Sequence, residues 1–351
     1  MEMTRDVFDQ QRLPRFGTAN PERMRLEFWE WMIRGDPAPP PDEGSPLNKI
    51  GLLIREGVLK SRHGPARARD LFQIPRRRED GPIWAFDRMG ATRTSLSDGR
   101  IVCVGGEHED YYDPDFCIYN DVVVLGPGDR VEIYGYPRGD FPPTDFHTAT
   151  PVGDRIILIG RLGAAADRRP GHTPVHALDL SDYRISTIET SGEGPGWLSR
   201  HEAEYDTRGT INVRGGEVAV GTGRGSRLRR NGEDYALDLG TGVWRRLTSR
   251  NWSQFSIEQA SRGAFWREQA IDAASLYPRG IDHIVVPRER RREVRFLVAG
   301  IPINVESGIW TIDVVVEGNL PTDFVEDIAE EIRANAEAAC QRPCKCERLS
   351  P

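Results

Sequence analysis

The acidic loop that follows a pair of glycines has the highest density of side chains capable of chemistry in the 351-residue sequence. Hard cations are held by several carboxylate oxygens that converge on one point, and Asp113 and Asp115 have a suitable spacing. The loop lacks the glycine and the distal glutamate of an EF-hand, so a partner-binding surface and a plain solvated loop stay open beside a metal site. Its candidate residues are Glu107, His108, Glu109, Asp110, Tyr111, Tyr112, Asp113 and Asp115.

Histidines and cysteines offer two further candidates. His147, His201 and His283 each precede a β-rich run, and three imidazoles around one point can bind zinc or copper. The cysteines at 340, 344 and 346 are one ligand short of a structural zinc site. A disulfide, a reactive tail and a metal shared between chains are alternatives to a disordered tail with free thiols, which is the favoured interpretation. We therefore assign no metal and no other cofactor.

Motifs for nucleotide binding and nucleophilic catalysis are not recognisable. The glycine-rich stretch 221–225 lacks the lysine and hydroxyl residue of a P-loop and is not followed by a predicted helix. It is better explained as a loop between strands. No nucleophile elbow and no Cys/His pair are found, so catalytic residues stay unassigned.

Composition restricts the partners and the compartment. A formal net charge of −7 argues against nucleic acid as the main partner, because phosphate binding depends on a basic surface. No run approaches the roughly 18 to 20 apolar residues that span a bilayer. The N-terminus lacks a secretory pattern, and five cysteines do not make a disulfide framework. We expect a cytoplasmic protein; the strong preference for arginine over lysine indicates codon bias, as in a GC-rich bacterium.

A sequence repeat determines where most of these candidate residues lie in the expected fold. Gly105, Gly160 and Gly215 are spaced by 55 residues, and each follows a short β-rich run. Two further strands follow each glycine, and Asp-Gly or similar turns precede each run. Self-similarity at this period is typical of a propeller or a solenoid.

Residues 82–252 resemble the Kelch-repeat family. The diglycine that ends the family's inner strand is present at Gly105-Gly106 and Gly215-Gly216 but is replaced by Gly160-Arg161 in the middle repeat. The aromatic residue near the last strand is kept only as Trp244. The resemblance implies four-stranded blades with a loop-built surface at each end. It also implies a structural hydrogen bond between blades for His147, His201 and His283, which is their favoured role.

Three blades do not close a ring, since propellers have about four to eight. A degenerate fourth blade over 281–316 is slightly favoured over a separate α+β module at 265–346, and self-association could also complete the ring. The expected fold is all-β, a Kelch-type β-propeller of three clear blades and a degenerate fourth, with flanking α-helices at both termini. The expected domains are a helical extension at 1–80, the propeller at 81–318, and a C-terminal helix with a cysteine-containing tail at 319–351.

Helical segments are predicted on both sides of the repeats. Asn20-Pro21-Glu22 has the form of a helix start and predicts a helix to Arg34, whereas residues 1–20 carry no pattern. Weaker helices are expected at 47–60 and 65–72. The C-terminal helix after Pro321 has one apolar face, which we expect to lie on the outside of the propeller or against the N-terminal helix.

The favoured function is a protein-binding or scaffold module that uses the loops 107–118, 163–173 and 217–231 at one end of the propeller. Besides the acidic loop, the expected anchors are Arg168, Arg169 and Arg227. The alternative is an enzyme, with or without a metal, acting on a sugar or another small molecule, because Kelch-like propellers include galactose oxidase and sialic acid mutarotase. A regulatory protein that acts only with a neighbouring gene product is a third alternative.

Overall fold

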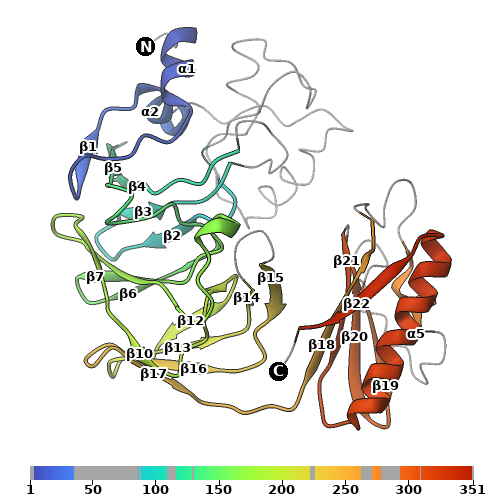
Figure 1. Cartoon of the computed structure of the whole chain (residues 1–351). Coiled ribbons are helices and arrows are strands. Elements are labelled where there is room, and N and C mark those ends of the chain that lie inside the picture. The colour runs from blue at the N-terminus through green and yellow to red at the C-terminus, as the bar shows by residue number, and fades with distance from the viewer. Residues whose placement is uncertain are drawn as a thin grey trace. The chain divides into compact units, whose positions relative to one another are not determined.

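The computed structural model describes residues 4–34, 86, 88–108, 116–128, 130–221, 226–261, 271–277, 293–308 and 310–349. The chain divides into two compact units. Unit 1 comprises Met1–Arg227 and Asp234–Leu247, and unit 2 comprises Leu228–Glu233 and Thr248–Pro351. Both are built on mainly antiparallel sheets (Figure 1), which confirms the β-rich class. No helix in the described part of the chain has the length and apolar character needed to cross a bilayer.

Unit 1 contains three sheets of the repeat type, one after another along the chain. Sheet 1 has the order β1-β5-β4-β3-β2, sheet 2 the order β6-β7-β8-β9, and sheet 3 the order β10-β17-β16-β13-β12. Within each, four consecutive repeat strands pair antiparallel, as the 55-residue period predicts. Their bounds are β1 Glu22–Met24, β2 Thr92–Ser95, β3 Ile101–Val104, β4 Val122–Gly126, β5 Arg130–Gly135, β6 Thr148–Val152, β7 Arg155–Ile159, β8 Val175–Asp179, β9 Ile185–Thr187, β10 Ser191–Gly192, β12 Glu202–Tyr205, β13 Thr210–Arg214, β16 Tyr235–Asp238 and β17 Val243–Arg246.

Two short strands accompany sheet 3, and a third crosses the boundary between the units. β11 (Leu198–Ser199) pairs antiparallel with β14 (Glu217–Val220). β15 (Arg227–Arg230) has its first residue in unit 1 and the others in unit 2. β10 is the exception to the antiparallel pattern, since it pairs parallel with β17.

The repeated glycines allow close passage of the backbone between neighbouring sheets. Gly105 and Gly160 have φ of 59° and 70°, in the left-handed region. A Cβ on Gly105 would lie 2.1 Å from the Thr144 carbonyl oxygen, and one on Gly160 would lie 2.3 Å from that of Leu198. No larger side chain fits at Gly105 and Gly160. At Gly215, where a Cβ would meet nothing within 4 Å, only the left-handed φ of 63° favours glycine.

Apolar clusters join the sheets of unit 1 into a stack. The first cluster joins sheets 1 and 2, with Val102 and Val124 against Ile156 and Leu158. Another joins sheets 2 and 3, with members that include Ile157, Ile211 and Trp244. β7 of sheet 2 thus places apolar side chains in both clusters, one cluster on each face of the sheet.

The N-terminal segment covers the remaining face of sheet 1. α1 (Arg5–Gln11) and α2 (Glu27–Arg34) place Phe8, Phe28 and Trp29 in a cluster with Tyr119 and Ile133. The predicted helix start at Asn20 is wrong, because residues 22–24 form β1 and extend sheet 1 at β5. Residues 1–20, predicted to be patternless, contain α1. The predicted helices at 47–60 and 65–72 lie outside the described residues.

Asn20 has another role than capping a helix. Its side-chain amide donates to the Ile185 carbonyl oxygen (2.7 Å) and accepts from the Ile185 backbone N–H (2.9 Å). These bonds satisfy the backbone N–H and C=O of Ile185, the first residue of β9. One side chain therefore covers part of the outer edge of this strand.

The far face of sheet 3 is polar. Glu202 and Arg214 form an exposed ion pair across β12 and β13, and Asn212 and Arg245 are exposed beside them. A terminal repeat with a polar outer face ends a stack without a further neighbour. The stack in unit 1 therefore runs from an apolar face covered by helices to a solvated face.

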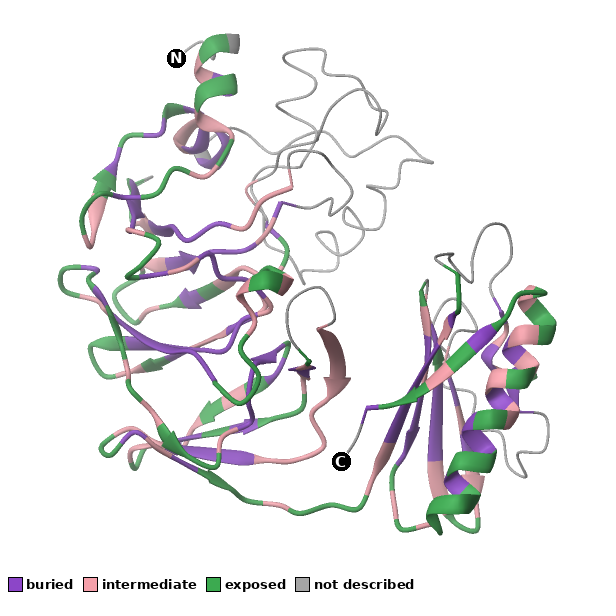
Figure 2. Ribbon diagram, in the orientation of Figure 1, coloured by how far each residue is buried: buried purple, intermediate pink, exposed green. Residues whose placement is uncertain are grey.

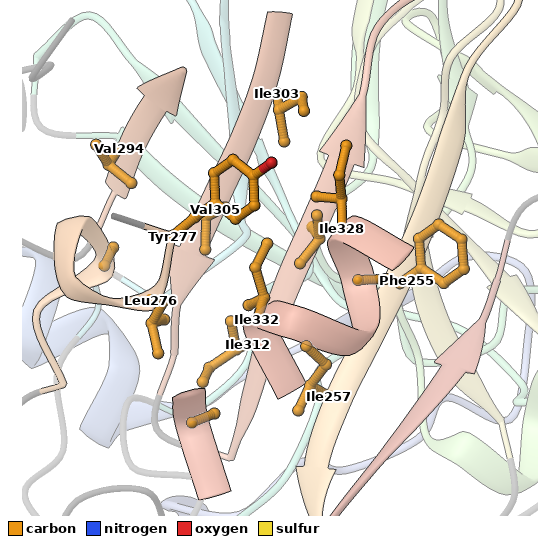
Figure 3. Packing of buried hydrophobic residues seen from close by; sticks show 14 of the residues in the cluster. Phe255, Ile257, Leu276, Tyr277, Val294, Ile303, Val305, Ile312, Ile328 and Ile332 are labelled. Carbon is orange, nitrogen blue, oxygen red and sulfur yellow. The ribbon is translucent and has the colours of Figure 1, made fainter. Parts of the chain in front are cut away.

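Unit 2 is a five-stranded sheet covered by a helix. The strand order is β19-β20-β21-β18-β22, and α5 (Thr322–Cys340) places Ile328 and Ile332 against Phe255, Ile257 and Ile312 (Figure 3). In Figure 2 the buried residues of α5 lie on its sheet-facing side. The strands are β18 Ser253–Gln259, β19 Glu293–Val298, β20 Ile301–Ser307, β21 Thr311–Val316 and β22 Cys344–Arg348, with a short 3-10 helix η4 at Ala273–Leu276.

This arrangement differs from the expected fourth blade over 281–316 and is closer to the alternative of a separate α+β module at 265–346, although the unit starts earlier and includes β18. β19, β20 and β21 share a core with α5, because the apolar face of α5 needs an apolar sheet to cover it. The expectation that this helix lies on the propeller or on the N-terminal helix is wrong for the same reason. The cysteine-containing tail, expected to be disordered, forms β22 and pairs with β18.

Candidate functional site

The acidic loop is only partly described. Glu107 and His108 lie in the described part of the chain, and Glu109, Asp110, Tyr111, Tyr112, Asp113 and Asp115 lie outside it. The Glu107 backbone bridges Met89 and Ile118. The site is therefore built from the residues around Glu107.

His147 and His201 form equivalent hydrogen bonds one repeat apart. Nε2 of His147 lies 3.0 Å from Oγ1 of Thr92, and Nε2 of His201 lies 3.0 Å from Oγ1 of Thr148. Burial lowers the pKa of both imidazoles to about 3, so they are neutral. The first bond links β2 to the residue before β6, and the second links β6 to the residue before β12.

These contacts agree with the structural role expected for the histidines. His283 lies outside the described residues. Within the described ranges, no group of three His, Cys, Asp or Glu side chains could hold a metal ion.

The loop after β7 folds onto the segment that precedes β6. The backbone N–H of Leu162 donates to the Asp145 carbonyl oxygen (3.0 Å), and that of Gly163 donates to Oδ1 of Asp145 (2.7 Å). Nη1 of Arg161 donates to the Pro143 carbonyl oxygen (2.7 Å). These bonds hold residues 161–163 against residues 143–145 at one end of sheet 2. Asp145 and Arg161 are thereby fixed in position.

Glu107 and Asp145 form a coupled pair of carboxyl groups. Asp145 is fully buried, its Oδ1 accepts from the Gly163 N–H, and its carboxyl group interacts with that of Glu107. Burial, and then the neighbouring Asp145, raise the pKa of Glu107 to about 7. Burial also raises the pKa of Asp145. The two carboxyl groups therefore titrate as a pair, and Glu107 is partly protonated near neutral pH.

Two arginine side chains of unit 1 are buried, and their positive charges have different surroundings. Arg88, 8% exposed, donates Nη1 and Nη2 to the two carboxylate oxygens of Asp121 and lies 3.5 Å from the Tyr119 ring centroid. Arg161, 7% exposed, lies over the Trp197 ring but forms no ion pair with any described residue. Within the described part of the chain, its Nε has no hydrogen-bond partner. Arg161 therefore carries a buried charge without an ion-pair contact to any carboxylate that the structure describes, although Asp167 and Asp145 act on it electrostatically.

Further arginines surround Arg161. Burial lowers its pKa to about 10; the charges of Asp167 and Asp145 oppose this shift, and those of Arg138 and Arg169 add to it. Arg169 is exposed, and Arg138 is mostly exposed with a 3.5 Å contact to Asp167. We call Glu107, Arg138, Asp145, Arg161, Arg169 and Arg200 the strand-end site.

Arg200 completes the strand-end site on the side of sheet 3. It pairs with Glu217 at 2.6 Å and lies over the Phe146 ring. The positive charge of Arg200 lowers the pKa of Glu107 and that of Asp145, against the raising effect of burial.

The predicted anchor residues are only partly brought together. Arg169 belongs to the strand-end site. Arg168 instead donates to the carbonyl oxygens of Leu162 and Gly163, both at 3.2 Å, and so stabilises its own loop. Arg227 lies in β15, half-buried, and takes no part in the contacts above.

Sequence reasoning missed Asp145, Arg161 and Arg200 as functional candidates. The signal for Arg161 was the broken diglycine. Gly106 and Gly216, at the equivalent positions, have φ of 90° and 81°, whereas Arg161 is not in the left-handed region. Asp145 had no comparable signal, because its importance depends on the loop that folds over it.

Comparison with known proteins adds no relative. No family model matches the chain, and no curated protein matches its sequence.

Proposed function

We propose that unit 1 is an array of three Kelch-type propeller blades that binds a protein partner through the strand-end site. The four-stranded repeats, the left-handed glycines and the repeated Thr–His bonds between sheets support the blade assignment. The array is open, with helices on its first face and charged side chains on its last. Loops at one end of such a rigid scaffold commonly carry the binding function.

Arg161 is the observation that carries this proposal. A buried guanidinium without a carboxylate in ion-pair contact among the described residues is unfavourable, and negative charge brought close to it would be favourable. Arg138 and Arg169 extend the positive charge toward solvent in a protein whose net charge is −7. An acidic segment of another protein is therefore the ligand that fits, with the exposed Arg138 and Arg169 as its contacts and the buried charge of Arg161 behind them.

Partner capture followed by calorimetry tests the proposal. The wild-type protein, Arg138→Gln/Arg169→Gln and Arg155→Gln would be used to capture proteins from the source cells. Arg155 is exposed at the opposite end of β7 and serves as the control. A partner identified by mass spectrometry is then purified and titrated against the three proteins. We expect at least a tenfold weaker Kd for the double variant, equivalent to about 1.4 kcal/mol, and no change for the control. Equal affinity for all three would reject the strand-end site.

A second function is favoured by the carboxyl pair. A carboxyl group that titrates near pH 7 can act as a general acid or base on a sugar or another small molecule. The test is a panel of sugars followed by NMR for isomerisation or hydrolysis. Turnover that is lost in Glu107→Gln but kept in Arg138→Gln/Arg169→Gln would place enzymatic activity ahead of partner binding.

A further inference from the structure

The turn between α5 and β22 brings two thiols together. Sγ of Cys340, the last residue of α5, lies 3.7 Å from Sγ of Cys344, the first residue of β22. Gln341 ends the helix in the left-handed conformation with φ of 55°, which lets the chain reverse within four residues. Both thiols lie within 3.4 Å of the Arg342 carbonyl oxygen.

The backbone on both sides of this pair is held in place. The Cys344 N–H donates to the Glu337 carboxylate (2.9 Å), and the Cys344 carbonyl oxygen accepts from Arg333 (3.1 Å). Arg333 and Glu337 are themselves paired along α5 at 2.6 Å. On the other side, Cys344 is in register with Gln259 of β18. The two sulfur atoms thus lie 3.7 Å apart on a fixed turn, and a disulfide requires them to approach to about 2 Å.

We propose that Cys340 and Cys344 form a reversible disulfide that fastens the end of α5 to the edge strand β22. Both residues are still free thiols in this structure. The oxidant is a peroxide or a small disulfide. With hydrogen peroxide, the half-buried Cys340 is oxidised first to a sulfenic acid with release of one water. Cys344 then attacks that sulfur, the S–S bond forms, and a second water leaves. Two thiols and one peroxide thus give one disulfide and two waters.

Cys346 is the internal comparison. It lies two residues on along β22, so its side chain points to the same face as that of Cys344. Burial raises the pKa of Cys344 to about 12 and that of Cys346 to about 11, so the thiolate form of each is scarce at neutral pH. The attack of Cys344 on the oxidised Cys340 therefore depends on their separation of 3.7 Å, and it is this contact that distinguishes Cys344 from Cys346.

Tryptic mapping separates the thiols, because Arg342 precedes a proline and resists cleavage. Peptide 334–345 contains Cys340 and Cys344, and peptide 346–348 contains Cys346. The folded full-length protein would be treated with hydrogen peroxide or oxidised glutathione, blocked with an alkylating agent and digested. We expect peptide 334–345 to be unalkylated and lighter by about 2 Da, for the two hydrogens lost, and to revert with dithiothreitol. Cys346 should stay alkylated.

Serine variants complete the test. Cys340→Ser and Cys344→Ser should each abolish the mass change, and Cys346→Ser should leave it intact. Hydrogen exchange of the β22 amides should slow in the oxidised wild-type protein alone. Full alkylation of peptide 334–345 after oxidation, or a cross-linked species that joins it to peptide 346–348, would overturn the proposal.

Discussion

The coupling of Glu107 to Asp145 makes a prediction about pH. Because the pKa of Glu107 rises from 4.5 to about 7 on folding, its contribution to stability is fully present below about pH 4.5 and is lost as the pH rises through 7. Between pH 5 and pH 8 the wild-type protein should lose on the order of 2 kcal/mol more unfolding free energy than Glu107→Gln. Urea unfolding at both pH values measures this difference. Glu189→Gln, an exposed control, should behave as wild type, and equal losses in all three proteins would disprove the coupling.

The Thr–His bonds predict a specific cost at the junctions between sheets. Thr148→Ala removes the hydrogen-bond partner of the buried His201 and should lower the unfolding free energy by about 1 to 2 kcal/mol. Thr92→Ala should do the same through His147. Thr187→Ala, at an exposed position of β9, is the matched control in the same denaturant series. If all three substitutions have the same effect, the bonds do not stabilise the stack.

Two residues of the strand-end site, Glu107 and Arg169, were predicted from the sequence. The others were not, and the reason is physical. A period-based comparison shows that Arg161 replaces a glycine, so the position could be singled out from sequence. Asp145 is ordinary in sequence, and it becomes notable only when the Gly163 N–H and the Glu107 carboxyl reach it. Long-range burial decides its chemistry, and a local pattern does not report burial.

At the scale of elements, the N-terminal helices replace a neighbouring sheet. Trp29 is 2% exposed and packs edge-on against Tyr119, which lies just before β4 of sheet 1. Trp29→Ala should therefore destabilise unit 1 by about 3 to 5 kcal/mol in denaturant unfolding. Leu247→Ala, at a side chain that is half exposed, should change stability by less than about 0.5 kcal/mol. A small effect at Trp29 would show that the helices are not part of the folded stack.

Element boundaries show where sequence patterns succeed and fail. The strands and turns of the repeats were predictable because period-2 burial and glycine turns are local signals. The helix start at Asn20 was not, because the segment 22–24 gains backbone bonds to β5 that no local rule includes. The strands 293–316 resemble a blade in pattern, and only their shared core with α5 assigns them to another module.

At the scale of the whole molecule, two separate cores predict two separable unfolding transitions. Ile332 is fully buried between α5 and the sheet of unit 2. Ile332→Ala should lower the transition of unit 2 by about 2 to 5 kcal/mol and leave that of unit 1 unchanged, with the reverse for Trp29→Ala. Intrinsic fluorescence and circular dichroism, measured across a urea gradient, follow the two unfolding transitions. A single transition shifted equally by both substitutions would contradict the division into two units.

Photo-cross-linking tests the binding function most directly. A benzophenone amino acid would be placed either at position 170, in the loop of the strand-end site and next to Arg169, or at position 154, in the hairpin at the opposite end of β7. Both positions are exposed, and neither belongs to the proposed binding residues. After irradiation in the source cells, we predict that one partner protein is cross-linked from position 170 and not from position 154. Cross-linking of the same partner from position 154 alone, or of none from position 170, would contradict binding at the strand-end site.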